Sequence, residues 1–550
     1  MLAQAPSLPL PSGVERAEHA ITPATLAAVT RFLADDLLEG RAPASRGDRL
    51  TRRYIATQLQ ALGLEPGAAA GSWEQPLEIV GITTKAPEAW SFLGPEGEAR
   101  LAWWDDYIAT IGLQAERAGF DDAPVVFVGY GITAPEYGWD DFKGADLRGK
   151  VLLMLNNDPD WDPDLFAGKK RLYYGRWDYK YESAARQGAK GAIIVHTTPS
   201  AGYPWQVVQS SWTGEQFDLP VTEGPRMQAT GWTTEEAARR LVALGGFDLA
   251  KLVESARSRS FRPVPLGITT SLHLEAGLRH LETANVAGLL RGRDPLLKDE
   301  VVIYTAHHDH LGIGKADATG DTIYNGALDN ASGVAQLLVI AGAFAALPTP
   351  PRRSVLFLSV AGEESGLLGS GYFASHPTFP AGRIAADINF DGANIWGRTR
   401  DIALIGRGKS DLDRVLEMAA ARQGRRVVEE AFPDRGHYYR SDQFSFAKIG
   451  VPCLYFDNGI DYVGRPPGWG QKKVEEWEAT HYHQPSDEFG PEWDLTGVVD
   501  DARLGFVTGL AVAEADTMPA WLPKDEFEAA RKRALAEARA QAPDAGGRGE

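Results

Sequence analysis

The stretch Tyr304–Gly312 reads YTAHHDHLG and continues an apolar run that begins at Val301. The run VVIYTA is rich in β-branched and aromatic residues, which predicts a buried strand ending at His307. Two further apolar runs end in acidic residues, RSVLFLSVAGEE at Glu364 and RIAADINFD at Asp391. In an open parallel sheet the ligand site lies outside the carboxyl ends of the strands. A histidine and carboxylates are therefore expected to meet at one edge of a sheet.

Helical patterns separate these strands. The segment after Asp329 places Val334, Leu337, Leu338 and Ala341 on one helical face. Strands that alternate with helices imply βαβ units and a parallel sheet. The predicted fold class is α/β, with a mixed, mostly parallel sheet flanked by helices and an inserted mainly-β domain.

The length of 550 residues predicts several domains, because a single core rarely grows beyond about 250–300 residues. We expect a flexible segment over residues 1–21 and an N-terminal part over 22–115 that packs on the α/β domain. A change to short β runs and turns predicts the insertion over 116–278. The α/β domain itself is expected over 279–520, followed by a C-terminal helix and tail over 521–550.

Charge and composition limit the partners. The net charge of −18 argues against nucleic acid and anionic membranes. No run approaches 18 apolar residues, so no membrane span is predicted, and the single Cys453 excludes an intrachain disulfide. The opening MLAQAPSLPLPSG lacks a basic, apolar export signal, so we expect that a signal was removed and that the protein is periplasmic or secreted. The pattern does not distinguish a monomer from a homodimer.

Five dispersed side chains have the chemistry of zinc ligands. Zinc binds histidine nitrogen and carboxylate oxygen at about 2.0–2.2 Å, and two metals about 3.5–4 Å apart can share a carboxylate and an activated water. Asp329 is the candidate for the shared carboxylate, although in LDNASG it could instead be a helix N-cap. The candidate ligands are His307, Asp329, Glu364, Asp391 and His483.

Two further acids are candidates for supporting roles. Asp309 lies two residues after His307, so on a strand it shares a face with His307 and can accept the other ring N–H; the alternative is a surface aspartate. Glu363 adjoins Glu364, and alternation at a strand end would leave its carboxylate as a general base; the alternative is a charge pair at a helix N-terminus. The neighbouring His308, His310 and His481 are interpreted as non-ligands.

The motifs resemble those of a known family. AHHDHLG, GALDNASGVA, AGEESGLLGS, NFD and YHQPSD occur in the order and rough spacing of the di-zinc exopeptidases, over about residues 279–515. That family contains bacterial leucyl aminopeptidases, glutamate carboxypeptidase II and the catalytically inactive transferrin receptor. GKVLLM and AARQGAKGAIIVH resemble a protease-associated insertion.

The resemblance implies a role for each matching position. Asp329 would bridge two zinc ions, Glu363 would be the base, and Tyr482 would stabilise the oxyanion. The Asp329–Asn330 peptide resembles one that is often cis. In SDQFSFAKIGVP, Gln443 replaces the usual histidine, and position 308 is histidine where tyrosine is common. Arg440 and Gln443 are candidates for substrate contacts.

The implied activity is zinc-dependent removal of N-terminal residues from peptides. Other divalent ions could occupy the same donors. The alternatives are a carboxypeptidase or dipeptidase of the glutamate carboxypeptidase type, a glutaminyl cyclase with one zinc, and a non-catalytic, receptor-like module.

Overall fold

The computed structural model describes residue 8, residues 10–221 and residues 224–540. These residues belong to two compact units. The first, which we call the ligand-bearing unit, comprises Met1–Leu77, Glu282–Ala431 and Arg440–Glu550. The second, the inserted unit, comprises Glu78–Leu281 and Phe432–Tyr439.

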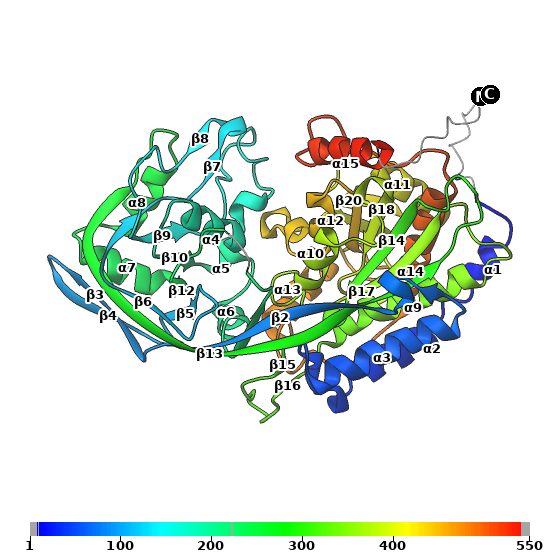
Figure 1. Cartoon of the computed structure of the whole chain (residues 1–550), viewed down its shortest axis with the longest axis horizontal. Coiled ribbons are helices and arrows are strands. Elements are labelled where there is room, and N and C mark those ends of the chain that lie inside the picture. Colours follow the sequence, from blue (N-terminus) through cyan, green and yellow to red (C-terminus); the bar gives the residue numbers. More distant parts are fainter. Residues whose placement is uncertain (1–7, 9, 222–223, 541–550) are drawn as a thin grey trace. The chain divides into compact units, whose positions relative to one another are not determined.

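Three adjacent parallel strands form the centre of the sheet in the ligand-bearing unit (Figure 1). β14 (Val301–His307) lies between β17 (Ser354–Val360) and β18 (Ile384–Asn389), and both pairings are parallel. β21 (Cys453–Asn458) is parallel to β18. The three strands that were predicted to carry ligands therefore end side by side.

The sheet becomes mixed towards its edges. β19 (Asp401–Ile405) is antiparallel to β21 and parallel to β20 (Arg426–Glu429). On the opposite edge, β13 (Val264–Leu290) is antiparallel to β17 and to β1 (Glu65–Pro66). The predicted mixed, mostly parallel sheet is confirmed.

Helices cover this sheet, with α9 and α14 on one side of the strands and α10 and α12 on the other (Figure 1). α9 (Ser332–Ala345) packs on β14 and β17, and α14 (Thr496–Glu514) packs on β14 and β18. α12 (Gln443–Lys448) contacts β18 and β21 and packs against α10 (Leu368–Ser375). α11 (Leu412–Arg422) adds a further helix against α14.

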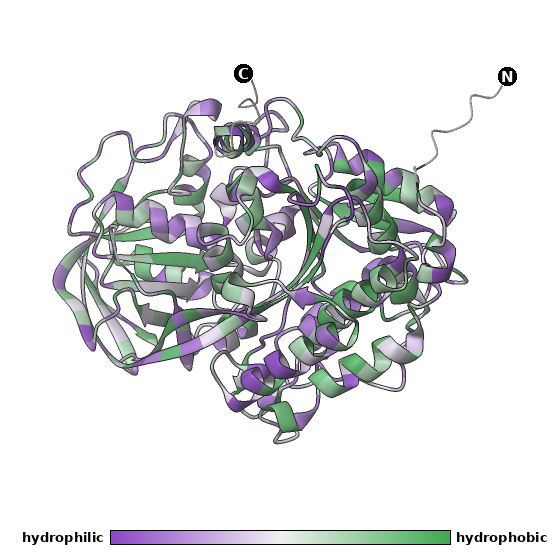
Figure 2. Ribbon diagram, turned by 45° about the vertical axis from the view of Figure 1, so that its right-hand side comes forward, coloured by the Kyte–Doolittle hydropathy of each residue, from purple (hydrophilic) through white to green (hydrophobic). Residues whose placement is uncertain are grey.

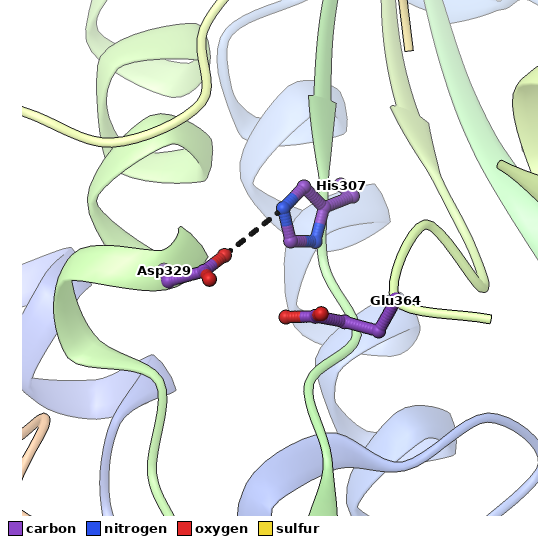
Figure 3. A group of neighbouring side chains, drawn as sticks. All are labelled: His307, Asp329 and Glu364. Carbon is purple, nitrogen blue, oxygen red and sulfur yellow. Dashed lines mark ion pairs between the residues drawn. The ribbon is translucent and has the colours of Figure 1, made fainter. Parts of the chain in front are cut away.

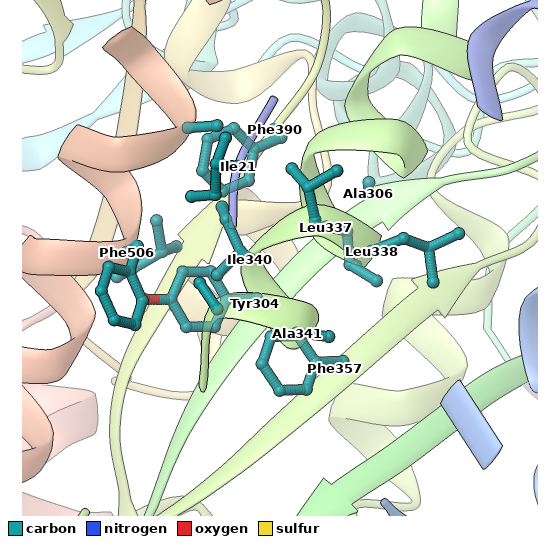
Figure 4. Packing of buried hydrophobic residues seen from close by; sticks show 14 of the residues in the cluster. Ile21, Tyr304, Ala306, Leu337, Leu338, Ile340, Ala341, Phe357, Phe390 and Phe506 are labelled. Atoms are coloured by element: carbon teal, nitrogen blue, oxygen red, sulfur yellow. The ribbon is translucent and has the colours of Figure 1, made fainter. Parts of the chain in front are cut away.

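Stacked aromatic rings fill the core between β14 and the helices (Figure 4). The ring of Tyr304 lies parallel to Phe357, with centroids 5.4 Å apart, and meets Phe344 edge-on at 5.7 Å. The Tyr304 hydroxyl donates to the carbonyl of Gly505 in α14 at 2.9 Å. A buried tyrosine needs such an acceptor for its polar end, so this contact joins the central strand to the helix that covers it.

The central strands of the ligand-bearing unit are mostly green, the colour of hydrophobic residues, in Figure 2, and α9 is buried along nearly its whole length. Among the described residues, the segment Ala327–Ala345 is long and apolar enough to cross a membrane, and 83% of its apolar window is buried inside the protein. Its burial against β14 and β17 is typical of a core helix.

The N-terminal residues contradict the expectation of a flexible segment over residues 1–21. α1 (Val14–Glu18) is helical, and Val14, Ala17 and Ile21 belong to the main core. Val14 and Ala17 are three residues apart and share one side of this short helix, and Ile21 follows it after a turn. Residues 1–7 and 9 lie outside the described part of the chain.

Two longer helices follow in the N-terminal part. Thr22 caps α2 (Pro23–Leu33) by accepting the N–H of Thr25 at 3.2 Å. α2 ends at Leu33, and a 3-10 turn spans Asp36–Arg41. α3 (Arg46–Ala61) begins at the cap Ser45.

The inserted unit begins earlier than predicted. Residues 78–115 were expected to pack with the α/β domain, but they belong to this unit. The reason is strand pairing: β3 (Ala89–Gly94) pairs with residues 269–270 of β13, and β5 (Tyr107–Ile111) pairs with β12 (Ala229–Thr234). The alternation of apolar residues in 78–115 indicates strands, but it does not indicate which strands they pair with.

The inserted unit contains strands and several short helices. Its strands include β2 from Glu78 onward (Glu74–Lys85 in full), β4 (Gly97–Ala102), β6 (Arg117–Phe127), β9 (Val151–Leu155), β10 (Gly191–His196) and β11 (Glu215–Asp218). Its helices include α4 (Trp177–Arg186), α5 (Thr198–Ala201), α6 (Trp205–Ser211), α7 (Glu235–Ala243) and α8 (Leu249–Ala256). At the other end of the chain, α13 (Trp469–Thr480) precedes α14, and the predicted C-terminal helix is α15 (Glu528–Ala540).

We expect Gly509→Ala to destabilise the ligand-bearing unit. A Cβ at Gly509 would lie 1.9 Å from the Tyr304 hydroxyl, whereas a Cβ at Gly371 in α10 would meet nothing within 4 Å. Overpacking of a core costs about 1–3 kcal/mol, while glycine-to-alanine in an open helical position gains about 1 kcal/mol. Urea unfolding should therefore show a lower midpoint for Gly509→Ala and an unchanged or higher midpoint for Gly371→Ala. Equal midpoints for the two variants would contradict the proposed packing.

Candidate metal centre

The ends of three neighbouring strands deliver side chains to one place. His307 is the last residue of β14, Glu363 and Glu364 follow β17, and Asp391 follows β18. Because β17, β14 and β18 are adjacent and parallel, these side chains emerge at the same edge of the sheet. The expected convergence is confirmed by the distances below.

His307 forms one half of the cluster. Its Nε2 lies 3.3 Å from Asp329 Oδ1 and 3.3 Å from Asp391 Oδ1. Figure 3 shows the imidazole at the end of its strand, facing the Asp329 carboxylate and close to Glu364. One ligand atom from each of these three residues lies within 4.8 Å of the others.

His483 forms the other half. Its Nε2 lies 3.2 Å from Asp329 Oδ2 and 3.1 Å from Glu364 Oε2. The two oxygens of Asp329 thus face different histidines, one from β14 and one from the loop before α14. All five sequence-predicted ligands meet, and Asp329 lies between the two halves. It is not the N-cap of α9, and the Asp329–Asn330 peptide is cis.

The spacing of the donor atoms fits zinc. Ligands about 2.0–2.1 Å from a tetrahedral ion lie about 3.3 Å from one another, and four histidine nitrogen–carboxylate oxygen pairs of the cluster are separated by 3.1–3.3 Å. Nitrogen and carboxylate oxygen are also the donors that zinc accepts. The residues present therefore fit zinc, with one histidine and two carboxylates in each half.

The cluster concentrates negative charge in a buried place. The side chains of Asp329, Glu363 and Glu364 are at most 16% exposed. Burying like charges together is costly unless cations compensate them. Asp391 adds a fourth carboxylate, so the site favours divalent cations over an empty state.

The negative charge of the carboxylates also raises the pKa values of the two histidines. Burial alone would lower the pKa of His307, but the carboxylates of Glu363 and Asp391 outweigh burial and raise this pKa well above the usual value. For His483, Glu364 and Asp329 likewise overcome burial and raise the pKa to about 10. These carboxylates hold a positive charge where a metal ion would sit.

Glu363 differs from its neighbour Glu364. Burial, reinforced by Asp391 and Glu364, raises the pKa of Glu363 well above its usual value, while His307 opposes the shift. Burial and Asp329 push the pKa of Glu364 upward, but His483 and His310 outweigh them and lower it to about 2. One glutamate is therefore suited to ligation, and the other to accepting a proton.

Asp309 supports the cluster, but its main-chain oxygen rather than its carboxylate lies nearest to His307. His307 Nδ1 is closest to the main-chain oxygen of Asp309, at 3.2 Å, while the Asp309 carboxylate is 3.7 Å away. A donating Nδ1–H leaves Nε2 free for a metal. The carboxylate of Asp309 accepts the backbone N–H groups of Glu363 at 3.1 Å and Glu364 at 3.4 Å.

Two supporting residues escaped the sequence analysis. His310, interpreted as a non-ligand, is fully buried, and its Nδ1 lies 2.6 Å from Glu364 Oε1, the oxygen that does not face His483. Asp487, in the quoted motif YHQPSD, accepts the backbone N–H of Leu328 at 2.8 Å and of Asp329 at 3.1 Å. The motif contained Asp487, but only the fold shows that it holds the bridging residue.

The remaining predicted residues lie near the cluster. Tyr482 stacks beside His483, with ring centroids 4.0 Å apart, and its hydroxyl oxygen accepts a hydrogen bond from Arg440 at 3.0 Å. Gln443 has no exposed surface, and its Oε1 accepts a hydrogen bond from Asn389 at 2.8 Å. The position of Gln443 favours a supporting role over contact with substrate.

Comparison with known proteins agrees with this geometry. Residues 285–507 match the profile of Peptidase family M28. The fold is similar to that of an aminopeptidase from Aneurinibacillus sp. strain AM-1, with a TM-score of 0.54 and 19% sequence identity, over 92% of this chain and 96% of that one. At this identity the likeness concerns the fold.

Two fungal proteins share a shorter stretch. Both are named "Probable zinc metalloprotease", one from Pyrenophora tritici-repentis (strain Pt-1C-BFP) and one from Pyrenophora teres f. teres (strain 0-1). Each is 37% identical over 109 residues, which make up 20% of this chain and 24% and 22% of those proteins. The matched stretch thus spans about a quarter of the relatives' length.

We expect the two halves of the cluster to lose metal separately. His483→Ala should remove one zinc and keep the other, whereas Asp329→Ala should remove both, because only Asp329 faces both histidines. Metal content after dialysis, measured by mass spectrometry, tests this order. His196→Ala, a buried histidine of the inserted unit whose ring contacts Tyr203, is the control and should leave the metal content unchanged. Equal metal content in the His483 and Asp329 variants would argue against a shared carboxylate.

Proposed function

We propose that the Peptidase family M28 domain formed by residues 285–507 makes this chain a zinc-dependent aminopeptidase, which removes N-terminal residues from peptides. The observation that carries the proposal is the Asp329 carboxylate, with one oxygen 3.3 Å from His307 and the other 3.2 Å from His483. A carboxylate shared in this way is what a two-metal hydrolytic site requires.

The proposed zinc ions would be held by His307 and Asp391 in one half, by His483 and Glu364 in the other, and by Asp329 in both. When bound, the two ions would polarise the scissile carbonyl and lower the pKa of a water molecule toward about 7. Manganese or cobalt could occupy the same donors.

Glu363 is the proposed general base. Its Oε2 lies 4.0 Å from His307 Nε2, so it borders the ligand cluster. Burial raises its pKa well above the usual value, which helps the carboxylate to take a proton from the attacking water. The same carboxyl group then gives that proton to the leaving amine.

Tyr482 is the proposed donor to the oxyanion. Burial raises the pKa of its phenol well above the usual value, although Arg440 opposes the shift, so the hydroxyl stays protonated. Arg440 donates to the phenolic oxygen, and this contact leaves the phenolic proton available for a substrate oxygen. Charge that develops on the substrate carbonyl is then stabilised where it forms.

Aminopeptidase action is preferred to carboxypeptidase action because of the local charge. A free N-terminal ammonium would be attracted by the carboxylates around Asp391 and Glu363, whereas a C-terminal carboxylate would need an available cation. Arg440 already donates to Tyr482. The name of the Aneurinibacillus aminopeptidase supports the same choice.

The alternatives differ in measurable ways. A glutaminyl cyclase would hold one zinc, and a receptor-like module would hydrolyse nothing. The protease-associated character of the inserted unit and the periplasmic or secreted location stay predictions from the sequence.

Glu363→Gln should keep both metals and lose turnover. Removal of a general base costs roughly 10²–10⁴-fold in rate, while the ligands are untouched. The measurements are kcat and metal content on the same preparation. Glu514→Gln, which alters a glutamate paired with Arg293 at 2.6 Å, is the matched control and should keep its activity. A normal kcat for Glu363→Gln would show that Glu363 is not the general base.

A substrate panel decides the direction of cleavage. Aminoacyl-p-nitroanilides should be hydrolysed, and N-acetylated versions of the same compounds should not, because acetylation removes the charged amine. N-blocked dipeptides with a free carboxylate test the carboxypeptidase alternative, and N-terminal glutaminyl peptides test the cyclase. Preference for the N-blocked dipeptides would reverse the assignment.

A further inference from the structure

Arg41 is a fully buried cation in the N-terminal part of the ligand-bearing unit. It lies at the end of the turn Asp36–Arg41, far outside residues 285–507, and its exposed fraction is 1%. Its guanidinium donates to four main-chain carbonyls. Nε reaches His308 at 2.8 Å, Nη1 reaches Asn325 at 2.6 Å and also Leu33, and Nη2 reaches Gly326 at 2.9 Å.

Two of these carbonyls belong to segments that carry metal ligands. His308 immediately follows His307, and Gly326 stands three residues before the bridging Asp329. A single planar group thus fixes the backbone on both sides of the cluster. Its fork of donors has a rigid geometry, which a flexible lysine does not reproduce.

Asn325 in turn donates hydrogen bonds to the N-terminal part. Its side-chain Nδ2 donates to the carbonyl of Ala34 at 2.8 Å and to Asp36 Oδ1 at 2.8 Å. The turn that holds Arg41 and the segment that leads to Asp329 are therefore bonded in both directions. A shift of one of them would break contacts in the other.

The backbone of the turn is strained. Glu39 and Arg41 have φ values of 51° and 55°, in the left-handed region that residues with a Cβ rarely adopt, and Gly40 between them has a φ of 66°. A Cβ at Gly40 would lie 2.5 Å from the carbonyl oxygen of Tyr324 and 2.6 Å from that of Gly312. Strain of this kind persists where the surrounding structure holds it, and it concentrates at functional sites.

A second contact from the N-terminal part reaches the same strand end. Asp48 of α3 places Oδ1 3.3 Å from His308 Nε2, and Ser359 of β17 lies 3.0 Å from His308 Nδ1. His308 is thus buried between an N-terminal helix and the neighbouring strand. Residues 33–48 contact the segment after His307 at two separate points.

The charge of Arg41 also suits the site. Burial lowers the pKa of its guanidinium to about 10, against the opposing pull of Asp309, Asp487 and Asp329. The group stays cationic at neutral pH. It therefore places a permanent positive charge behind a cluster of acids.

We propose that Arg41 is a positioning residue for the two-metal site, which holds the main chain after His307 and before Asp329 so that their side chains face the same ions. The inference rests on the proposed function. Residues 33–48, which lie outside the matched residues 285–507, would then contribute to the affinity of the site for metal.

Arg353 is a matched comparison within the same unit. It is also 1% exposed, and it donates to Glu300 Oε2 at 2.7 Å and to the carbonyls of Val512 at 3.0 Å and Ala515 at 2.5 Å. It precedes β17, at the end of the strand opposite to the ligands. It shares the burial and bonding of Arg41 without a link to the metal ligands.

The experiment compares Arg41→Lys, Arg41→Ala and Arg353→Lys in the full chain. Stepwise zinc dissociation constants are measured by chelator competition, and the absorption spectrum of the cobalt-loaded protein reports ligand geometry. Loss of a group that supports metal ligands typically weakens metal binding about 10–100-fold. We expect that loss for both Arg41 variants, with a changed cobalt spectrum, and wild-type constants for Arg353→Lys. Added guanidinium ion should partly restore metal affinity to Arg41→Ala.

The outcomes separate this inference from the proposed function. A wild-type protein that binds no metal would defeat the proposed function itself. A wild-type protein with two metals and Arg41 variants with unchanged constants would overturn only the inference. If neither Arg41 variant folds, by circular dichroism, while Arg353→Lys folds, Arg41 is a residue of the fold and the inference is also overturned.

Discussion

The sharing of one carboxylate between two histidines is the contact on which the site depends. Asp329 faces His307 with one oxygen and His483 with the other, at 3.3 and 3.2 Å. Because Glu363, Glu364 and Asp391 crowd the same buried place, the arrangement is stable only when positive charge offsets the acids. Metal binding and folding would therefore be linked at this site, because the acids whose burial is costly without a cation are also the groups that could hold a metal ion.

The order of the strands in the sheet explains why these side chains lie together. Parallel neighbours β17, β14 and β18 end at one edge, so three ligand-bearing segments start from fixed positions. The other two ligands come from irregular segments, which need separate support. Asp487 holds the backbone N–H groups of Leu328 and Asp329, and Asp309 holds those of Glu363 and Glu364.

Most of this positioning comes from side chains that bind main-chain groups beside the candidate ligands. The carboxylates of Asp309 and Asp487 bind backbone donors, while the guanidinium of Arg41 binds backbone acceptors at His308, Asn325 and Gly326. Such contacts orient a ligand without competing for the metal. The contacts of Arg41 also join residues 285–507, which match the family profile, to an N-terminal segment that the match does not include.

The sequence by itself determined the strands, the helices between them and the five candidate ligands, because apolar periodicity and the order of the motifs are local properties. It did not determine that Val14, Ala17 and Ile21 enter the core, or that residues 78–115 join the inserted unit, because these depend on which distant surface each segment meets. The same reason hid His310, Asp487 and Arg41. Each is an ordinary residue in its own stretch, and only the tertiary structure brings its polar group against a candidate ligand or the main chain beside one.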